Sequence, residues 1–188
     1  MVAQVLAGDR DRFRELVERY QSRIYGLALR LVGNPTEAED LTQQSFIEAF
    51  RGLRSYDPHR SFSTWLTCIA LNNCKDHLKS HKRRERQLIG DVDQGGALFT
   101  GRLPPPDQLL TAQERAELVT AALMRLDSKY RVPLVLKDVE GWSYNEIQQE
   151  LDLPLTTLKI RVVRARAKLQ EQLRPWLSTD RKKRTGTS

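Results

Sequence analysis

Apolar residues recur at steps of three and four along much of the chain, the spacing that places side chains on one stripe of a helix. The first such run spans residues 13–31 and predicts an amphipathic helix, which the Gly-Asn-Pro segment at 33–35 ends. Thr36 stands three residues before Glu39. This capping-box pattern predicts that a second helix starts here.

Two further helices are predicted in the amino-terminal half. The apolar positions of the second helix are Leu41, Phe46, Ile47 and Phe50. A turn at 55–60, with Asp57-Pro58 inside it, separates this helix from a third one, which we predict from Ser63 to about Lys79. Three helices with short connections can bury a shared core.

The composition changes after the third helix. Residues 79–86 form a basic run, and residues 89–106 contain four glycines and a triple proline with little periodicity. Segments rich in Gly and Pro do not hold a packed core. The segment 87–108 is therefore predicted to be a flexible linker.

Helical spacing resumes after the linker. One helix is predicted over the apolar positions between Leu109 and Leu126, and a second over Val132–Val139. Pro133 fits best in the first turn of the latter helix, where a missing amide hydrogen costs little.

The sharpest local pattern comes next along the chain. The segment Ser143-Tyr144-Asn145-Glu146 is a second capping box, and Asp152-Leu153-Pro154 breaks the short helix that follows it. Thr156 or Thr157 can cap another helix, which runs to about Leu173. Two short capped helices around a tight turn form a helix-turn-helix.

These patterns predict an all-α fold of two small helical domains joined by a flexible linker. The expected boundaries are a helical bundle at 1–86, the linker at 87–108, a helix-turn-helix domain at 109–177 and a disordered basic tail at 178–188.

Charge and composition narrow the class of protein. Of the 188 residues, 31 are Lys or Arg and 24 are Asp or Glu, so the formal net charge is +7. This balance favours polyanionic partners such as nucleic acid. We find no signal-peptide pattern and no continuous apolar stretch of roughly 18 residues. The latter absence leads us to expect no insertion into a membrane. Because two cysteines cannot make a disulfide framework, we expect a cytoplasmic protein with reduced thiols.

The last predicted helix has two chemically different faces. Its apolar face comprises Leu158, Val162, Ala165, Leu169 and Leu173. A basic sector well away from that face comprises Thr157, Arg161, Arg164 and Lys168, and the other side of the apolar face is flanked by Lys159 and Arg166. Such a helix can pack on a partner helix and present guanidinium groups to the major groove of DNA, where Arg pairs with guanine. We favour this interpretation over a solvated basic helix.

The third helix of the amino-terminal half mixes aromatic, amide and basic side chains. They are Phe62, Trp65, Asn72, Asn73, Lys75 and Lys79, followed by Lys82, Arg83 and Arg84. This combination is typical of surfaces that stack on exposed bases and follow a phosphate chain. Taken alone it is weak evidence, because a Trp in a helix is more often a core residue.

Two long segments carry a resemblance to a known family. They are AEDLTQQSFIEAFRGLRSYDPHRSFSTWLTCIALNNCKDHL and LVLKDVEGWSYNEIQQELDLPLTTLKIRVVRARAKL. Together they resemble the blocks of an extracytoplasmic-function sigma factor, group 4 of the sigma-70 family, and the similarity runs from about Val5 to Trp176. The resemblance implies a transcription initiation subunit whose first domain binds the −10 promoter element and whose second domain binds the −35 element.

In the first domain, the resemblance implies roles for individual residues. The surface for the β′ coiled coil of RNA polymerase corresponds to Asp40, Gln43, Gln44 and Phe46. The family commonly has Glu at the position of Gln44. Phe62 and Trp65 match aromatic positions that help to separate the strands, and Asn72 matches the edge of a pocket for a flipped −10 base.

The second domain is matched in the same way. The positions that read the −35 element correspond to Lys159, Arg161 and Arg164, and the phosphate contacts to Arg166 and Lys168. A relative has a small polar residue in place of Ile160, so the resemblance does not give the −35 sequence itself.

The resemblance also implies partners. We expect core RNA polymerase, bound through its β′ coiled coil and β flap, promoter DNA and an anti-sigma protein. The sequence has no GxxxxGK[ST] loop, so we expect no nucleotide cofactor, no metal and no catalytic residue, with phosphoryl transfer left to the polymerase.

Three other interpretations are weaker. Cys74, His77 and His81 share a helical face and could offer three zinc ligands, but a structural site needs a fourth and Cys68 projects elsewhere. The main alternative function is a conventional helix-turn-helix regulator that acts without polymerase. A DNA-cutting enzyme is disfavoured because the acidic residues, Asp40 among them, form no metal-binding constellation.

Overall fold

The computed structural model describes residues 2–6, 11–89 and 111–184. Within these ranges every element is helical and no strand is present, which confirms the all-α prediction. The chain divides into two compact units, an amino-terminal one within Met1–Val92 and a carboxy-terminal one within Asp93–Ser188. Most of the predicted linker lies outside the described residues, as do 185–188 of the predicted tail.

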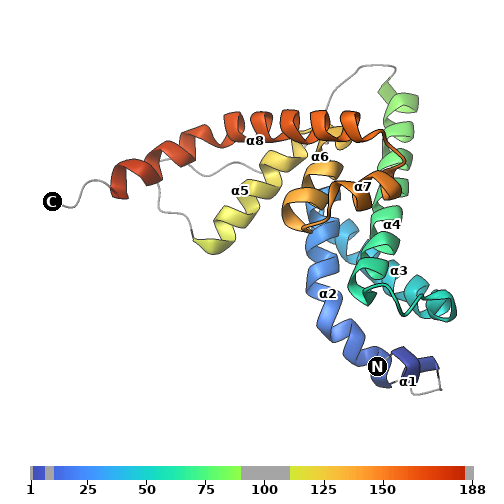
Figure 1. Ribbon diagram of the computed structural model, residues 1–188. Coiled ribbons are helices and arrows are strands. Elements are labelled where there is room, and N and C mark those ends of the chain that lie inside the picture. The colour runs from blue at the N-terminus through green and yellow to red at the C-terminus, as the bar shows by residue number, and fades with distance from the viewer. Residues whose placement is uncertain (1, 7–10, 90–110, 185–188) are drawn as a thin grey trace. The chain divides into compact units, whose positions relative to one another are not determined.

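The amino-terminal unit is a bundle of three long helices with two short elements (Figure 1). Its elements are α1 (Val2–Leu6), α2 (Asp11–Val32), α3 (Pro35–Gly52), η1 (Leu53–Ser55) and α4 (Phe62–Ile89). Each of the three long helices contacts the other two. Their shared core includes the fully buried Ile24, Leu27 and Leu31 of α2 and Leu66 and Leu71 of α4.

The turn between α2 and α3 differs from the predicted one. Gly33 takes a positive φ of 80°, and the side chain of Asn34 accepts hydrogen bonds from the backbone N–H groups of Thr36 and Glu37. Asn34 is therefore the N-cap, and Pro35 occupies the first helical position, for which its fixed φ is suited. The predicted capping box of Thr36 with Glu39 is wrong.

Helix α3 packs through small residues. Ala38, Ser45 and Ala49 are completely buried, and the Ser45 hydroxyl donates to the Leu41 carbonyl at 2.6 Å. Ile47, which we counted among the apolar positions of this helix, is 45% exposed. The predicted helix is thus confirmed, but its buried face is turned away from Ile47.

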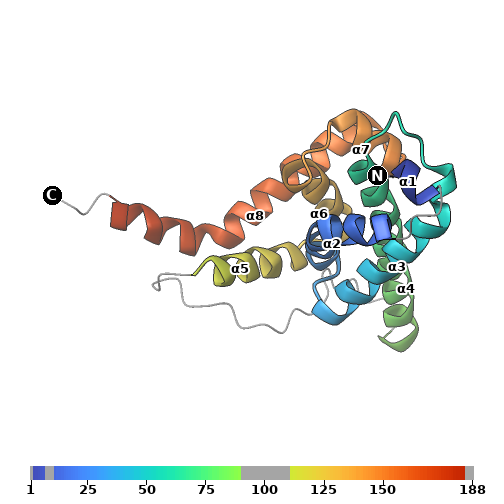
Figure 2. The same cartoon turned by 90° about the horizontal axis from the view of Figure 1, so that it is seen from below.

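In the described part of the carboxy-terminal unit, every element is again helical. Its elements are α5 (Ala112–Met124), α6 (Ser128–Leu134), η2 (Val135–Val139), α7 (Tyr144–Leu151) and α8 (Leu155–Arg184). Figure 2 shows α5 running alongside α8, and α5, α6 and α7 all contact that helix. The core is centred on Leu126, Leu136, Ile147, Leu158 and Val162, which are at most 1% exposed.

A junction of two helical forms lies between α5 and α7. Helix α6 begins at Ser128 because the Asp127 side chain accepts a hydrogen bond from the Lys129 N–H. Pro133 therefore lies near the end of α6, not in the first turn of a helix as predicted. The backbone continues as a π-helix, η2, in which the Glu140 N–H donates to the Val135 carbonyl five residues before it.

Arg131 is a buried cation at this junction. Its side chain is 2% exposed, and Nη1 donates to the carbonyl oxygens of Met124 and Leu126 at 3.3 and 3.4 Å. These carbonyls lie at the end of α5 and just beyond it, where a cation is stabilising. Burial lowers the pKa of Arg131 to about 10, against the opposing effect of the Asp127 charge.

The helix-turn-helix is formed by α7 and α8. The predicted capping box is confirmed, because Ser143 Oγ accepts from the Glu146 N–H while Glu146 accepts from the Ser143 N–H. Asp152 ends α7 in the left-handed conformation, with φ of 49°. The Leu158 N–H donates to the Pro154 carbonyl, so α8 begins before the two threonines that were predicted as caps.

Two helices run past the expected domain boundaries. Helix α4 ends at Ile89 and includes the basic run at 79–86. Helix α8 ends at Arg184, so the backbone at 178–184 is helical where we predicted disorder. Lys and Arg are good helix formers, which favours helix in the basic run at the end of each extension. In the part of the chain that the structure describes, no helix is long and apolar enough to span a membrane.

Candidate nucleic-acid and polymerase interfaces

Helix α8 separates its core-facing side chains from its basic ones. Leu158, Val162 and Ala165 are completely buried against the rest of the carboxy-terminal unit. At 100° per residue the predicted basic sector is centred about 110° from this face. Within that sector Arg164 and Lys168 are exposed, while Thr157 and Arg161 are half-buried. The structure therefore leaves the basic sector accessible along more than three turns.

Tyrosine rings support two of the predicted DNA-binding lysines. Lys168 Nζ lies 5.0 Å from the ring centroid of Tyr130, and Lys159 Nζ lies 5.9 Å from that of Tyr144. Lys137 Nζ, from η2, also lies over the Tyr144 ring at 5.0 Å. Cation–π contacts of this kind orient the ammonium groups without neutralising them. The two contacts could not be predicted from local sequence patterns, because Lys159 is 15 residues from Tyr144 and Lys168 is 38 residues from Tyr130.

Arg166 is engaged within the protein. Its Nε donates to Asp138 Oδ2 at 2.8 Å and a second guanidinium nitrogen donates to Asp138 Oδ1, a two-pronged ion pair that links α8 to η2. The hydrogen bonds to Asp138 raise the pKa of Arg166. A DNA phosphate would therefore have to compete with the Asp138 carboxylate for the Arg166 guanidinium, which was predicted to contact phosphate.

On α4, the predicted nucleic-acid residues divide between two faces. Trp65, Asn72 and Lys79 fall within about 40° of one another, opposite the buried positions of the helix. Asn72 is exposed, and its Oδ1 accepts from Lys75 Nζ at 3.2 Å. Asn73 instead turns towards α3, where its Nδ2 donates to Ser45 Oγ at 3.2 Å. Asn73 is thus a packing residue in this structure.

Four aromatic rings gather at the start of α4. Phe62 and Trp65 have ring centroids 5.6 Å apart, and both lie within 6 Å of the Tyr56 ring. Tyr20 of α2 completes the cluster at 5.4 Å from Phe62. Phe62 is only 8% exposed, so its ring serves the cluster, whereas Trp65 keeps a partly accessible side.

The predicted polymerase-binding residues lie on α3. Asp40, Gln43 and Gln44 are exposed and share one face of the helix. Phe46 is 7% exposed and belongs to the core, which is at odds with its predicted role as a contact residue. Ile47 takes its place on the exposed face, so this surface combines polar side chains with one aliphatic group.

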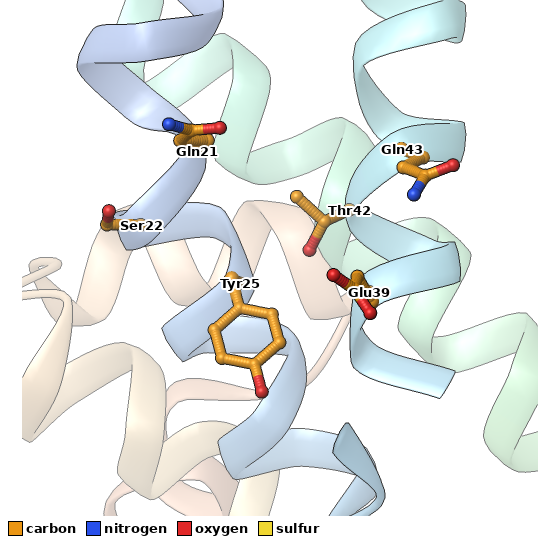
Figure 3. A pocket seen from close by; sticks show the side chains of 6 residues that line it. All are labelled: Gln21, Ser22, Tyr25, Glu39, Thr42 and Gln43. Atoms are coloured by element: carbon orange, nitrogen blue, oxygen red, sulfur yellow. The ribbon is translucent and has the colours of Figure 1, made fainter. Parts of the chain in front are cut away.

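A shallow hollow adjoins this face between α2 and α3 (Figure 3). Its volume is about 370 Å³. The lining residues are Gln21, Ser22 and Tyr25 from α2 and Glu39, Thr42 and Gln43 from α3. Gln43 is common to the hollow and to the predicted polymerase-binding surface. The hollow could not be predicted from sequence patterns, because it depends on how α2 and α3 approach each other.

The possible zinc ligands do not form a metal site in this structure. They are Cys74, His77 and His81. Cys74 is completely buried, and burial raises the pKa of its thiol to about 12. His77 Nε2 lies 3.1 Å from Glu37 Oε2 in the first turn of α3. Among the described residues, no group of three His, Cys, Asp or Glu side chains is placed to hold a metal ion.

Comparison with known proteins gives the family. The sigma-70 region 2 model matches residues 16–84, and the sigma-70 region 4 model matches residues 116–169. The ECF RNA polymerase sigma factor SigW of Bacillus subtilis (strain 168) is 34% identical over 178 residues, which cover 92% of this chain and 95% of that relative. The chain belongs to the extracytoplasmic-function sigma factors.

Other relatives agree with this sigma-factor assignment. The RNA polymerase sigma-H factor of Pseudomonas aeruginosa is 33% identical over 183 residues, or 94% of each chain. The solved structure of CnrH, in complex with the cytosolic domain of CnrY, has a TM-score of 0.61 and 28% identity over 92% of this chain and 94% of that one. The sigma factor RpoE of Bartonella quintana, in complex with the anti-sigma factor NepR, shares the fold with a TM-score of 0.66 and 23% identity, covering 87% of this chain and 97% of that one.

The matched regions correspond to the two units of this sigma factor. Region 2 extends over α2, α3 and α4, and region 4 over most of α5 to the middle of α8. A sigma factor is an initiation subunit of RNA polymerase, not an enzyme in its own right.

Proposed function

We propose that this sigma factor binds core RNA polymerase, recognises the −35 and −10 promoter elements and promotes strand separation by capturing flipped −10 bases. The observation that carries the proposal is the basic sector of α8, in which Arg164 and Lys168 are exposed and Thr157 and Arg161 are half-buried, on a capped helix-turn-helix in the region 4 unit. The face of α4 with Trp65 and Asn72 adds a candidate surface for separated bases in the region 2 unit.

Reading of the −35 element is assigned to α8. The second helix of a helix-turn-helix enters the major groove, where an Arg donates two hydrogen bonds to O6 and N7 of guanine. Arg164 is exposed, and none of the ion pairs found among the described residues involves its guanidinium. Arg161 and Lys168 lie within the same sector.

Strand separation is assigned to α4 and the aromatic cluster. Unstacking a base step costs a few kcal/mol, and a protein without a fuel meets this cost only by binding separated bases better than paired ones. Trp65 offers a partly accessible ring for stacking, and Asn72 an exposed amide for hydrogen bonds to a base edge. The Phe62 ring packs against the Trp65 ring, with the two centroids 5.6 Å apart.

Binding of core polymerase is assigned to the exposed face of α3. Asp40, Gln43, Gln44 and Ile47 present polar groups around one aliphatic side chain, a composition suited to a helical partner such as the β′ coiled coil. From membership of the sigma factor family we also infer that the carboxy-terminal unit docks on the β flap of the polymerase. The protein would then act in the cytoplasm.

An anti-sigma protein is a further expected partner. RpoE of Bartonella quintana is solved with the anti-sigma factor NepR, and CnrH with the cytosolic domain of CnrY. We propose that a comparable protein covers the polymerase-binding surface of this chain.

Run-off transcription tests the proposal. Purified core RNA polymerase is supplied with a genomic promoter library, with and without the full chain, and new start sites should appear only when the chain is present. A conventional regulator would bind paired half-sites without polymerase, which is the outcome that contradicts a sigma function.

Arg164 provides a sharper test of −35 reading. Replacing Arg164 with Ala should reduce transcription from promoters with an intact −35 element by an amount equivalent to about 1–3 kcal/mol, because a base-edge contact is lost. Unchanged promoter selectivity in this variant would exclude Arg164 from base reading.

A further inference from the structure

Helix α8 carries a second apolar strip, on the side away from its core. Ile160 is 51% exposed and Val163 is 61% exposed. Ile160 projects about 180° from the centre of the buried face, and Val163 and Ala167 lie within about 60° of Ile160. We call Ile160, Val163 and Ala167 the outer strip.

Folding does not account for the outer strip. Exposed Ile and Val bury little surface in this unit, and both are poorer helix formers than Lys, Glu or Ala because their branched side chains lose rotamer freedom. Single exposed aliphatic residues are common on protein surfaces. Two of them one turn apart on the exposed side of a recognition helix form a contiguous patch that suits a partner.

The charges beside the outer strip indicate what the partner is. Lys168 lies about 80° from Ile160 on one side, and Lys159 lies about 40° beyond Val163 on the other. Both side chains are exposed. An apolar strip with a cation on either side complements a surface that has methyl groups between two rows of anions. The major groove of DNA is such a surface, because the C5-methyl group of thymine projects into it between the phosphate backbones.

The spacing of the strip also fits the groove. Ile160 and Val163 are three residues apart, a rise of about 4.5 Å along the helix. Successive base pairs are separated by about 3.4 Å, so the two side chains can reach neighbouring pairs.

We propose that Ile160 and Val163 read thymine in the −35 element, by packing against the C5-methyl groups of one or two neighbouring A·T pairs. This inference rests on the proposed reading of the −35 element by α8. It adds two apolar specificity residues to the basic ones, and it states which base they select.

The test removes the methyl group and nothing else. In a promoter obtained from the run-off library, each thymine of the −35 segment is replaced in turn by deoxyuridine, which pairs identically but lacks the C5-methyl. Binding of the complete holoenzyme is then measured by competition. Burying one methyl group strengthens binding by about fourfold, so we expect a loss of about that size at one or two positions and none at the others.

The variants assign this loss to the strip. In Ile160→Ala and Val163→Ala, thymine and deoxyuridine should be bound equally at the position that each residue contacts. Leu177→Ala is the matched control, because Leu177 is 56% exposed on the same helix but lies about 21 Å further along it than Val163. This control should keep the full preference for thymine.

Three results would overturn the inference. One is an equal deoxyuridine penalty in the wild type and in both strip variants, which assigns methyl reading to other residues. Another is unchanged binding of the wild-type holoenzyme when deoxyuridine replaces thymine at every −35 position, while Arg164→Ala still weakens binding. That result would contradict the inference but leave the proposed function intact. The third is weaker assembly of the strip variants with core polymerase and an unchanged thymine preference, which makes the strip a protein contact. If the chain directs no transcription at all, the proposed function and this inference fail together.

Discussion

Arg166 and Lys168 are two residues apart on α8 but have different surroundings. Arg166 is held by Asp138, whereas Lys168 is exposed and lies over the Tyr130 ring. Each phosphate neutralised by a protein cation contributes about 0.9 to the slope of log affinity against log salt concentration. Lys168→Ala should therefore reduce this slope by about 0.9 in holoenzyme binding to promoter DNA, while Arg166→Ala should leave it unchanged.

The Arg166 variant has a readout of its own. Losing an exposed ion pair costs about 0.2–1 kcal/mol of unfolding free energy, which denaturant titration can detect. A fall in the salt slope for Arg166→Ala would show that Arg166 leaves Asp138 to bind a phosphate.

Asn72 and Asn73 are neighbours in sequence with opposite surroundings. Because Asn72 is exposed and Asn73 is hydrogen-bonded to Ser45, we expect Asn72→Ala to leave folding and core binding intact and to reduce open-complex formation. Asn73→Ala should instead lower the unfolding free energy by about 0.5–1.5 kcal/mol, the value of a typical hydrogen bond. Permanganate footprints of the melted strand and denaturant titrations separate the two effects. Identical footprints for wild type and Asn72→Ala would contradict the pocket assignment.

Phe46 and Ile47 show where residue-level prediction stops. The helical period was predicted correctly, but the positions of large apolar residues do not show that small residues make much of the buried face of α3. Ala38, Ser45 and Ala49 allow close helix contact, and Ile47 then faces solvent. The exposed polar residues Asp40, Gln43 and Gln44 were found from the resemblance, because polar surface positions need no knowledge of packing.

At the level of elements, the capping box of α7 gives a direct test. Ser143 Oγ satisfies the Glu146 N–H at the start of this helix. Ser143→Ala should lower the unfolding free energy by about 0.5–2 kcal/mol, as the loss of an N-cap does in other proteins. Thermal or denaturant unfolding measures this change. Ser143→Asp is the matched control, since Asp caps as well as Ser.

Acid should weaken the same element. Hydrogen bonds from Ser143 lower the pKa of Glu146 below its ordinary value of 4.5. The contribution of the ionised carboxylate to stability is therefore complete above 4.5 and is lost as the pH falls through the lower pKa of the folded state. As the pH is lowered below 4.5, the unfolding free energy should decrease. The decrease should be smaller in Glu146→Gln, whose side-chain amide oxygen still accepts a hydrogen bond but is not protonated in this range. Equal pH dependence in both proteins would contradict a role for Glu146.

The start of a helix was predicted correctly where the sequence offered a single candidate N-cap residue. The Ser143–Glu146 box had no competitor, and its prediction is confirmed. Thr36 competed with Asn34, which caps α3 because Pro35 fits the first helical position. The π-helical turn of η2 after Pro133 follows no local sequence rule, and its place depends on packing in the core of the unit.

For the whole molecule, the division into two units has a consequence for stability. Leu66 of α4 and Leu158 of α8 are completely buried, each in the core of its own unit. Replacing either with Ala should cost about 2–5 kcal/mol of unfolding free energy. Hydrogen exchange should show the loss of protection only in the unit that carries the substitution. A loss that spreads to both units in either variant would show that they unfold as one.

The two-unit organisation could be predicted because it depends on composition. A Gly- and Pro-rich segment between two periodic regions is visible in one sequence, and so is the charge of the last helix. Contacts such as Asp138 with Arg166, or Lys159 with Tyr144, depend on how helices cross within a unit, so they appear only in the structure.

The outer strip of α8 also bears on how the free protein behaves in solution. Aliphatic side chains that face water invite self-association, and the cations on either side act as gatekeepers that hold two copies apart by repulsion. Added salt screens that repulsion while it strengthens apolar contact. The purified factor should therefore aggregate less at low ionic strength than in concentrated salt. This is the opposite of the usual choice for nucleic-acid-binding proteins, which are kept in high salt to stop them from binding nucleic acid.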